Sequence, residues 1–296
     1  MTLLRSAAAG AILLSLAACT TAPVVTPVIE KMPETVSAVP PVQVAYPKDK
    51  FSYANFDEVQ ITHLDLNLDV NFDEKILDGV ATIDFKKIDP GAHTLILDTK
   101  DLTIREVQAL DSSGEWVAMT YSMRDKDETL GTALHIPFSK GMSKIRIDYK
   151  TSPKAEGLQW LSPEQTAGKK YPYLFSQGQA INVRTMTPVQ DTPAVRITYT
   201  ATLRTPPELL ALMSAEQDPY TPRDGEYSFS MPQPIPPYLL AIAVGDIDFK
   251  PINGHIGVYA EDYILDAAAE EFSETPLMEE ANERLYGPYR WGRYDL

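Results

Sequence analysis

The chain has 296 residues, a length that predicts roughly two domains. It contains 26 lysines and arginines against 41 aspartates and glutamates, and the resulting net charge of −15 disfavours binding to nucleic acids. Hydrophobic residues make up 44% of the chain and charged residues 23%, which excludes a chain that is disordered throughout. Because there is only one cysteine, an intrachain disulfide framework is also excluded.

A short apolar segment near the start of the chain indicates a targeting signal. Ala7–Ala18 is shorter than the roughly 20 apolar residues that a membrane-spanning helix needs, but it has the length of a signal-peptide core. It leads into Cys19 in the order Leu-Ala-Ala-Cys, which resembles a bacterial lipobox. We therefore predict that residues 1–19 form a lipoprotein signal peptide and that Cys19 carries the lipid. An ordinary signal peptide with a chance cysteine is the alternative.

Residues 20–50 are rich in proline, threonine, valine and alanine, a composition that favours extended chain over packed structure. We predict that they form a tether between the lipid and the folded part of the protein. Thr20 follows the cysteine, and a residue other than aspartate at this position predicts the outer membrane, with the protein facing the periplasm. The membrane is thus an expected partner, through the lipid.

From about Phe51 the pattern is typical of short β-strands. Apolar and polar residues alternate strictly over 64–73, Asp73–Lys75 is a predicted hairpin turn, and the alternation returns over 195–203. Many short strands separated by turn residues predict a mainly β fold, a saddle-like antiparallel sandwich over residues 51–250. The other predicted strands are 77–85, 94–97, 102–110, 116–123, 133–138, 145–151 and 238–244.

Residues 251–296 have a different pattern. A short strand is predicted over 257–260, and apolar residues then recur at helical spacing at positions 264, 268 and 272 and again at 277, 281 and 285. Thr275 is the predicted N-cap of the second helix, Pro276 its first residue, and Gly287 its end. One strand and two helices are too little to bury these apolar stripes, so we predict the truncated beginning of a second, α/β domain.

Several common catalytic motifs do not occur in the sequence. There is no H-E-x-x-H, no G-x-S-x-G, no phosphate-binding loop and no dinucleotide-binding glycine pattern. The four histidines, at positions 63, 93, 135 and 255, are isolated, whereas zinc ligands usually come as a close pair and a distant third. We therefore predict neither catalytic nor metal-binding residues in this chain.

One polar segment, Ser176–Asn182, has the composition of a binding site. On an extended strand, Gln177 and Gln179 would project from one face about 7 Å apart, and Gly178 would permit close approach of the backbone. Two neutral amides beside aromatic residues can orient a small polar ligand. An exposed polar strand face is the alternative that the residues by themselves favour.

Seven segments of the chain match, in order, the pattern of a known family. They are GLQWLSPEQ at 157–165, YLFSQGQAI at 173–181, QDTP at 190–193, ALMSA at 211–215, PIPPYL at 234–239, EFSET at 271–275 and GPYRWGRYDL at 287–296. They resemble the aminopeptidase N family of zinc metallopeptidases, in particular its leukotriene A4 hydrolase branch. The likeness runs from about Tyr53 to Leu296, and several matches in order are more specific than one short motif.

The resemblance implies a saddle-shaped N-terminal β domain followed by the start of a thermolysin-like catalytic domain. In the family, an H-E-x-x-H helix and a later glutamate bind zinc, and a G-x-M-E-N segment anchors the α-amine of the substrate. None of these motifs occurs in this sequence. Zinc as cofactor and peptides as substrates are therefore implied for a complete enzyme, and this chain provides no zinc ligands.

The resemblance also implies substrate-binding residues within 177–180. Gln179 falls where the family contacts the substrate amine, Gln177 where it lines the first side-chain pocket, and Ala180 beside them. Many family aminopeptidases have glutamate at the position of Gln179, and the hydrolase branch has glutamine. A neutral amide accepts a hydrogen bond from an ammonium group, with less Coulomb attraction than a carboxylate.

Two hypotheses of function remain open at this stage. The first is that the chain is the N-terminal part of a lipid-anchored zinc aminopeptidase that removes N-terminal residues from peptides. The second is a non-catalytic lipoprotein that keeps the β domain as a binding or structural module. Reading the gene past codon 296 separates them, because only the first expects G-x-M-E-N and H-E-x-x-H to follow.

Overall fold

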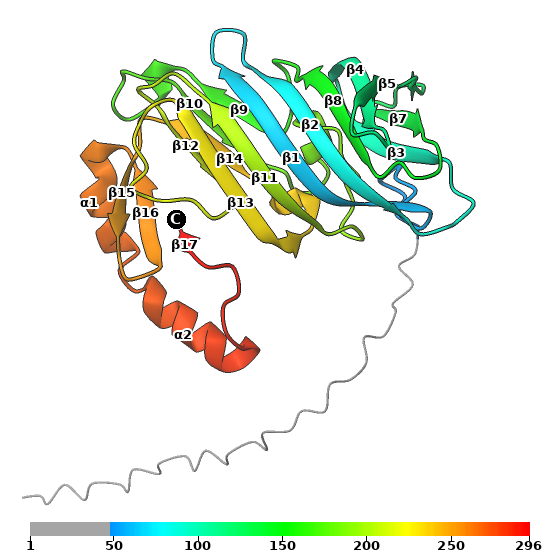
Figure 1. Ribbon diagram of the computed structural model, residues 1–296. Coiled ribbons are helices and arrows are strands. Elements are labelled where there is room, and N and C mark those ends of the chain that lie inside the picture. Colours follow the sequence, from blue (N-terminus) through cyan, green and yellow to red (C-terminus); the bar gives the residue numbers. More distant parts are fainter. Residues whose placement is uncertain (1–47) are drawn as a thin grey trace, which may run out of the picture. The chain divides into compact units, whose positions relative to one another are not determined.

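A computed structural model describes residues 48–296, and β-strands dominate it (Figure 1). This confirms the predicted mainly β class. The predicted signal peptide, the predicted lipidation site Cys19 and nearly all of the predicted tether lie outside the described residues. Among the helices that the structure describes, none is long and apolar enough to cross a bilayer.

The largest element is a seven-stranded sheet built around a long hairpin. In its first strand the alternating apolar residues Leu64, Leu66 and Leu68 are all buried, because successive side chains of a strand point to opposite faces. The predicted turn at Asp73–Lys75 connects this strand to the second. The sheet consists, in spatial order, of β13 (Glu226–Ile235), β11 (Ile197–Arg204), β1 (Val59–Asn71), β2 (Ile76–Lys87), β8 (Lys144–Lys150), β4 (Thr103–Leu110) and β5 (Trp116–Ala118).

The predicted sandwich is antiparallel with one exception in this sheet. Strand β1 pairs antiparallel with β2, but its other edge pairs parallel with β11. A hairpin forces antiparallel pairing, whereas β11 arrives after a long excursion of the chain and is free to lie parallel. This exception has no counterpart in the alternation of single strands, so local sequence does not predict it.

Two smaller sheets pack against the large one and share its core. The first is ordered β3 (Thr94–Thr99), β7 (Thr132–Pro137) and β6 (Ser122–Met123). The second is ordered β12 (Leu210–Met213), β14 (Ile242–Gly245), β10 (Tyr173–Ser176) and β9 (Leu158–Leu161), with the short 3₁₀ helices η1 (Pro163–Gln165), η2 (Val183–Thr185) and η3 (Pro237–Leu239). One cluster of buried hydrophobic residues connects all three sheets and includes Leu68, Leu97, Leu134, Leu174 and Val244.

Two predicted strands differ in detail from those observed. Residues 116–123 form two short strands, β5 and β6, which belong to different sheets. Residues 238–244 begin with the end of η3, and the strand β14 starts only at Ile242. Pro236 and Pro237 explain the second difference, because proline is favoured at the start of a helical turn and cannot donate a backbone hydrogen bond to a sheet.

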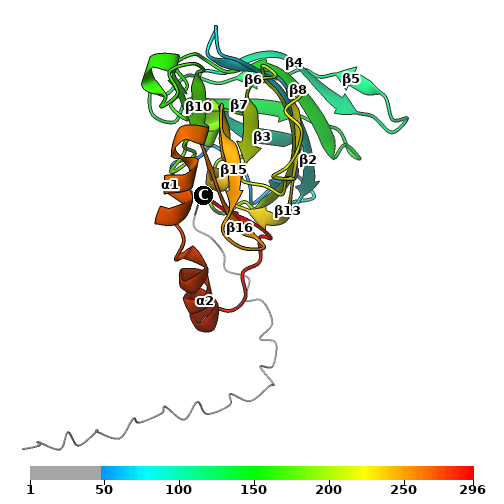
Figure 2. The same ribbon diagram turned by 90° about the vertical axis from the view of Figure 1, so that its left-hand side faces the viewer.

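The C-terminal part forms a third small sheet with two helices. Strands β15 (Asp248–Pro251), β16 (Ile256–Ala260) and β17 (Tyr294–Asp295) pair in that order, and β17 is parallel to β16. Helix α1 (Asp262–Glu271) packs on β15 and β16, on the side that faces away from the β domain (Figure 2). Helix α2 (Thr275–Tyr286) starts one residue before the predicted position, with Glu274 as its N-cap, a difference within the ordinary uncertainty of helix ends.

The apolar residues of α2 are largely exposed. Leu277 is 64% exposed, Met278 60% and Leu285 73%. The helix is attached through polar contacts, of which one joins Nε2 of His255 to the Glu279 carboxylate at 2.8 Å.

We expect Leu277→Ser to change the free energy of unfolding of this chain by no more than about 0.5 kcal/mol, because the leucine is already in solvent. Leu68→Ala, which empties a fully buried site in β1, is expected to cost about 2–5 kcal/mol. Urea unfolding of both variants measures the difference. A loss above about 1 kcal/mol for Leu277→Ser would show that α2 is packed against the rest of this chain.

Candidate functional site

The residues predicted to bind substrate lie just after strand β10. The strand ends at Ser176, and the chain then turns through residues 177–182. The prediction that Gln177 and Gln179 share one face of an extended strand is therefore wrong. The backbone N–H of Gln177 still donates to the carbonyl oxygen of Gly157, at 2.9 Å, but pairing ends here because the N–H of Gly157 donates to Oγ1 of Thr185, at 3.0 Å, and not to the carbonyl oxygen of Gln177. We call residues 177–182 the glutamine turn.

Close packing explains the glycine in the glutamine turn. The turn is closed by a hydrogen bond of 2.9 Å from the backbone N–H of Asn182 to the carbonyl oxygen of Gly178. A Cβ atom added to Gly178 would lie 2.8 Å from both the carbonyl oxygen of Tyr238 and a methyl group of Val183. Only glycine lets the backbone approach η3 this closely.

Three residues of the glutamine turn are exposed to solvent. Gln177, Gln179 and Ala180 are all exposed, and the peptide bond between Gln179 and Ala180 is cis. The side-chain oxygen of Gln177 accepts a hydrogen bond of 3.2 Å from the backbone N–H of Gln179. Exposed amide groups on a closed turn present acceptor oxygens that can bind N–H donors of a ligand.

The short helix that follows the turn, η2, contains a buried arginine. Arg184, in η2, is fully buried. Its guanidinium donates to the carboxylate of Asp191 at 3.1 Å, to the carbonyl oxygen of Phe51 at 2.8 Å and to that of Leu130 at 3.0 Å. Hydrogen bonds of this kind are stronger than those between neutral groups, because one partner carries a charge.

A second buried carboxylate completes the cluster. Asp98 lies 3.7 Å from the guanidinium of Arg184 and accepts hydrogen bonds from Oγ of Ser52 at 2.6 Å, from the backbone N–H of Tyr53 at 2.8 Å and from that of Asp191 at 2.9 Å. Burial raises the pKa of Asp191 to about 6, and Arg184 opposes the shift. Burial raises the pKa of Asp98 as well, again against Arg184.

A cavity of about 660 Å³ adjoins the element against which the glutamine turn packs. Leu239, at the end of η3, lines it, and other lining residues come from the four-stranded sheet and from residues 289–296. Its two charged residues, Arg293 and Asp295, pair with each other at 2.7 Å. The volume is that of a typical small-ligand site, and the neutralised charges suit apolar groups.

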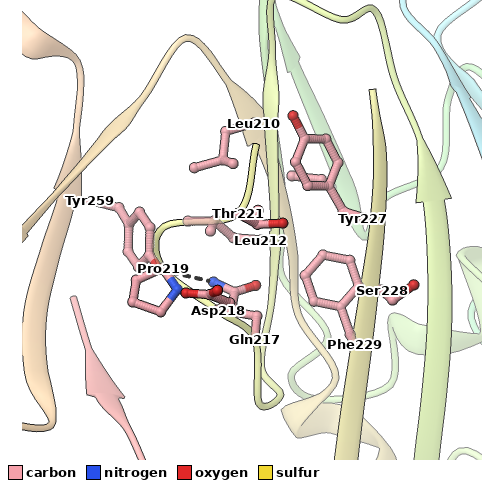
Figure 3. A pocket seen from close by; sticks show the side chains of 11 residues that line it. Leu210, Leu212, Gln217, Asp218, Pro219, Thr221, Tyr227, Ser228, Phe229 and Tyr259 are labelled. Carbon is pink, nitrogen blue, oxygen red and sulfur yellow. Dashed lines mark hydrogen bonds between the residues drawn. The ribbon is translucent and has the colours of Figure 1, made fainter. Parts of the chain in front are cut away.

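A second pocket, drawn in Figure 3, is too small for a substrate. It has a volume of about 30 Å³, enough for one or two water molecules. Gln217 lies in its wall and donates a hydrogen bond of 3.2 Å to the hydroxyl of Tyr259. This hydrogen bond joins the β domain to strand β16. Burial raises the pKa of Tyr259 to about 12, which keeps the hydroxyl neutral.

The side chains present do not fit a zinc site. Within residues 48–296, no three histidine, cysteine, aspartate or glutamate side chains are placed to hold one metal ion. His63 bonds the hydroxyl groups of Thr198 and Thr200 on the large sheet, and His255 bonds Glu279 on α2. The histidines therefore lie on separate elements.

Sequence reasoning missed the buried cluster and the cavity. Asp191 lies in a segment that carries the family resemblance, but nothing in its neighbourhood indicates that it is buried against Arg184. The partners of Arg184 come from Phe51, Leu130 and Asp191, and only the fold brings these together. The sequence therefore carries no local signal for this cluster.

Comparison with known proteins places the chain in a family. Residues 60–239 match the model of the Peptidase M1 N-terminal domain. The chain is 38% identical over 254 residues to leukotriene A-4 hydrolase of Xenopus laevis, which covers 84% of this chain and 42% of the relative. It is 33% identical over 288 residues to leucine aminopeptidase 2 of the yeast Vanderwaltozyma polyspora, covering 91% of this chain and 42% of that protein.

Solved structures agree with this match. Native yeast LTA4 hydrolase superposes with a TM-score of 0.78 at 31% identity, over 86% of this chain and 39% of the other. The M1 zinc metallopeptidase of Deinococcus radiodurans shares the fold, with a TM-score of 0.62 at 18% identity, over 80% of this chain and 56% of the other. The chain thus spans about two fifths of the length of the curated relatives it matches. Since the family model covers more than half of its residues, this chain belongs to the M1 peptidase family and carries that family's N-terminal domain.

Proposed function

We propose that this chain is the N-terminal part of a zinc aminopeptidase and that its glutamine turn binds the free α-amine of peptide substrates. The observation that carries the proposal is an exposed turn with two glutamine side chains, packed on the element that borders the large cavity. Relatives named as leucine aminopeptidases support the reaction type.

The proposed roles follow from the chemistry of the side chains. An ammonium group can donate hydrogen bonds to the side-chain oxygen of Gln179, which has no charge of its own to attract it. Gln177 would line the pocket for the first side chain of the substrate, with Ala180 beside it. The side-chain oxygen of Gln177 already accepts from the backbone N–H of Gln179, which holds the Gln177 side chain against the turn.

Chemical steps beyond binding require residues that this chain does not contain. When bound, zinc supplies an activated water for peptide hydrolysis in this family. The described residues offer no ligand set for it, so we propose that the metal and its base belong to a following catalytic domain. The exposed leucines of α2 support this proposal, because apolar residues on one helix face usually mark a contact surface.

We further propose that the protein is a lipoprotein of the bacterial outer membrane. The support is the sequence alone: a signal-like apolar segment, Cys19 within a lipobox-like motif, and a proline-rich stretch that would hold the β domain away from the membrane. Incorporation of radiolabelled palmitate, lost in Cys19→Ser, tests the lipidation. Equal labelling of both proteins would contradict it.

We expect the 296-residue chain alone to show no turnover of aminoacyl-anilides, even with added zinc, because the groups that activate water are missing. Activity is expected when the gene continues into G-x-M-E-N and H-E-x-x-H and the longer protein is assayed in the same way. Zinc-dependent turnover by the short chain would contradict the division of roles. An authentic stop after codon 296 would favour the non-catalytic binding module instead.

A further inference from the structure

We propose that Arg184 and Asp191 are positioning residues for the glutamine turn, so that a fully buried ion pair determines where the exposed glutamine side chains lie. The consequence for substrate binding rests on the proposed function. The mechanical link between the ion pair and the turn does not.

A short stretch of chain joins Arg184 to the glutamine turn. Arg184 is two residues beyond Asn182, where the turn closes, and the intervening Val183 is buried. The backbone of Arg184 is also held, since its N–H donates to the Asp191 carboxylate at 3.2 Å and its carbonyl oxygen accepts from the N–H of Lys100 at 2.8 Å. A shift of the arginine would therefore move the end of the turn.

Hydrogen bonds of Thr185 and Gly157 hold both ends of the glutamine turn. The hydroxyl of Thr185, next to the arginine, accepts from the N–H of Gly157 at 3.0 Å and donates to the carbonyl oxygen of Asn182 at 2.6 Å. The carbonyl oxygen of Gly157 in turn accepts from Gln177, where the turn begins. The helix η2 and Gly157 thus form a closed set of hydrogen bonds around the turn.

The guanidinium of Arg184 has the geometry to bond several partners at once. Arg184 reaches Phe51, Leu130 and Asp191, which lie far apart in the sequence. A planar group with five donors can bond all three at once, whereas a lysine ammonium lacks the fork that matches their arrangement. The turn packs on η3 at Gly178, but Gln177 and Gln179 are exposed, so we infer that their positions depend on this buried support.

Hydrogen exchange in the 296-residue chain tests the link without any assay of activity. In Arg184→Lys and Asp191→Asn, we expect the amides of residues 177–182 to exchange about tenfold faster or more, because local opening no longer has to break the charged network. Leu68→Ala is the matched control. It lowers global stability from a buried site on β1 that lies outside the charged cluster of Arg184, Asp98 and Asp191 described above. Its exchange is expected to rise in the β1–β2 hairpin and to stay unchanged in the turn.

Unchanged exchange of the turn in Arg184→Lys would overturn the inference, as would equal acceleration in Leu68→Ala. In the complete enzyme, Arg184→Lys is expected to raise KM for an aminoacyl-anilide about tenfold with a smaller change in kcat, because binding of the amine is affected. Faster exchange with an unaltered KM would uphold the link and contradict the assignment of amine binding to the turn.

Discussion

Replacing Arg184 by methionine is expected to lower the free energy of unfolding by about 3–5 kcal/mol. Methionine has a similar length but no charge, so Asp98 and Asp191 would stay buried without their cation, and the carbonyl oxygens of Phe51 and Leu130 would lose their donor. Urea unfolding followed by circular dichroism measures the loss.

Two controls separate this effect from a general loss of charge. Arg105→Met removes an exposed arginine that bonds Asp78 at 2.5 Å, and it is expected to cost no more than about 1 kcal/mol. In a double-mutant cycle, Asp191→Asn is expected to recover part of the loss caused by Arg184→Met, because it removes one of the uncompensated charges. A loss below about 1 kcal/mol for Arg184→Met would show that the buried cluster does not stabilise the fold.

The cost of Arg184→Met is also expected to depend on pH. The folded-state pKa of Asp191, about 6, lies above the ordinary value of an aspartate, so the folded state favours the protonated carboxyl. The stability that this group contributes is therefore greatest at low pH and is lost as the pH rises through 6. Arg184 lowers this pKa, so in Arg184→Met the pKa of Asp191 would rise further and the ionised carboxylate would cost more stability. The loss in Arg184→Met should therefore be larger at pH 8, where the carboxylate is ionised in the unaltered protein, than at pH 5.

Replacing Gln179 by alanine in a complete enzyme is expected to raise KM for aminoacyl substrates about 10- to 150-fold. This range corresponds to the 1.5–3 kcal/mol or so that a hydrogen bond to a charged group contributes. Gln179→Glu is expected to lower KM instead, because a carboxylate adds Coulomb attraction for the ammonium group. Steady-state kinetics with aminoacyl-anilides measures both changes.

Gln177→Ala provides the matched control in the same turn. Both side chains are exposed, so neither substitution should affect stability. Gln177→Ala should change the preference for the side chain of the substrate's N-terminal residue, but the substrate should still need a free amine. An N-acetylated substrate offers a second control, since it lacks the ammonium group. Identical KM values for Gln179→Ala and the unaltered enzyme would contradict amine binding by this residue.

Much of the β domain was predictable because strand patterns are local. The alternation of Leu64, Leu66 and Leu68 with polar residues specifies both a strand and its buried face. The helix α2 was predictable for the same reason, through apolar residues at helical spacing and a proline at its start. The parallel pairing of β1 with β11 was not, because a strand's own residues do not encode its neighbour.

In the candidate site, too, the sequence predicted some features and only the tertiary structure decided the others. The amino-acid sequence alone determined the class of fold, the family resemblance and the identity of Gln177 and Gln179 as the residues of interest. Tertiary structure decided their conformation, since pairing of the strand ends where the N–H of Gly157 donates to the hydroxyl of Thr185. It likewise decided that Arg184 is buried, because its charge is balanced only where distant parts of the chain meet, and a local pattern cannot carry that information.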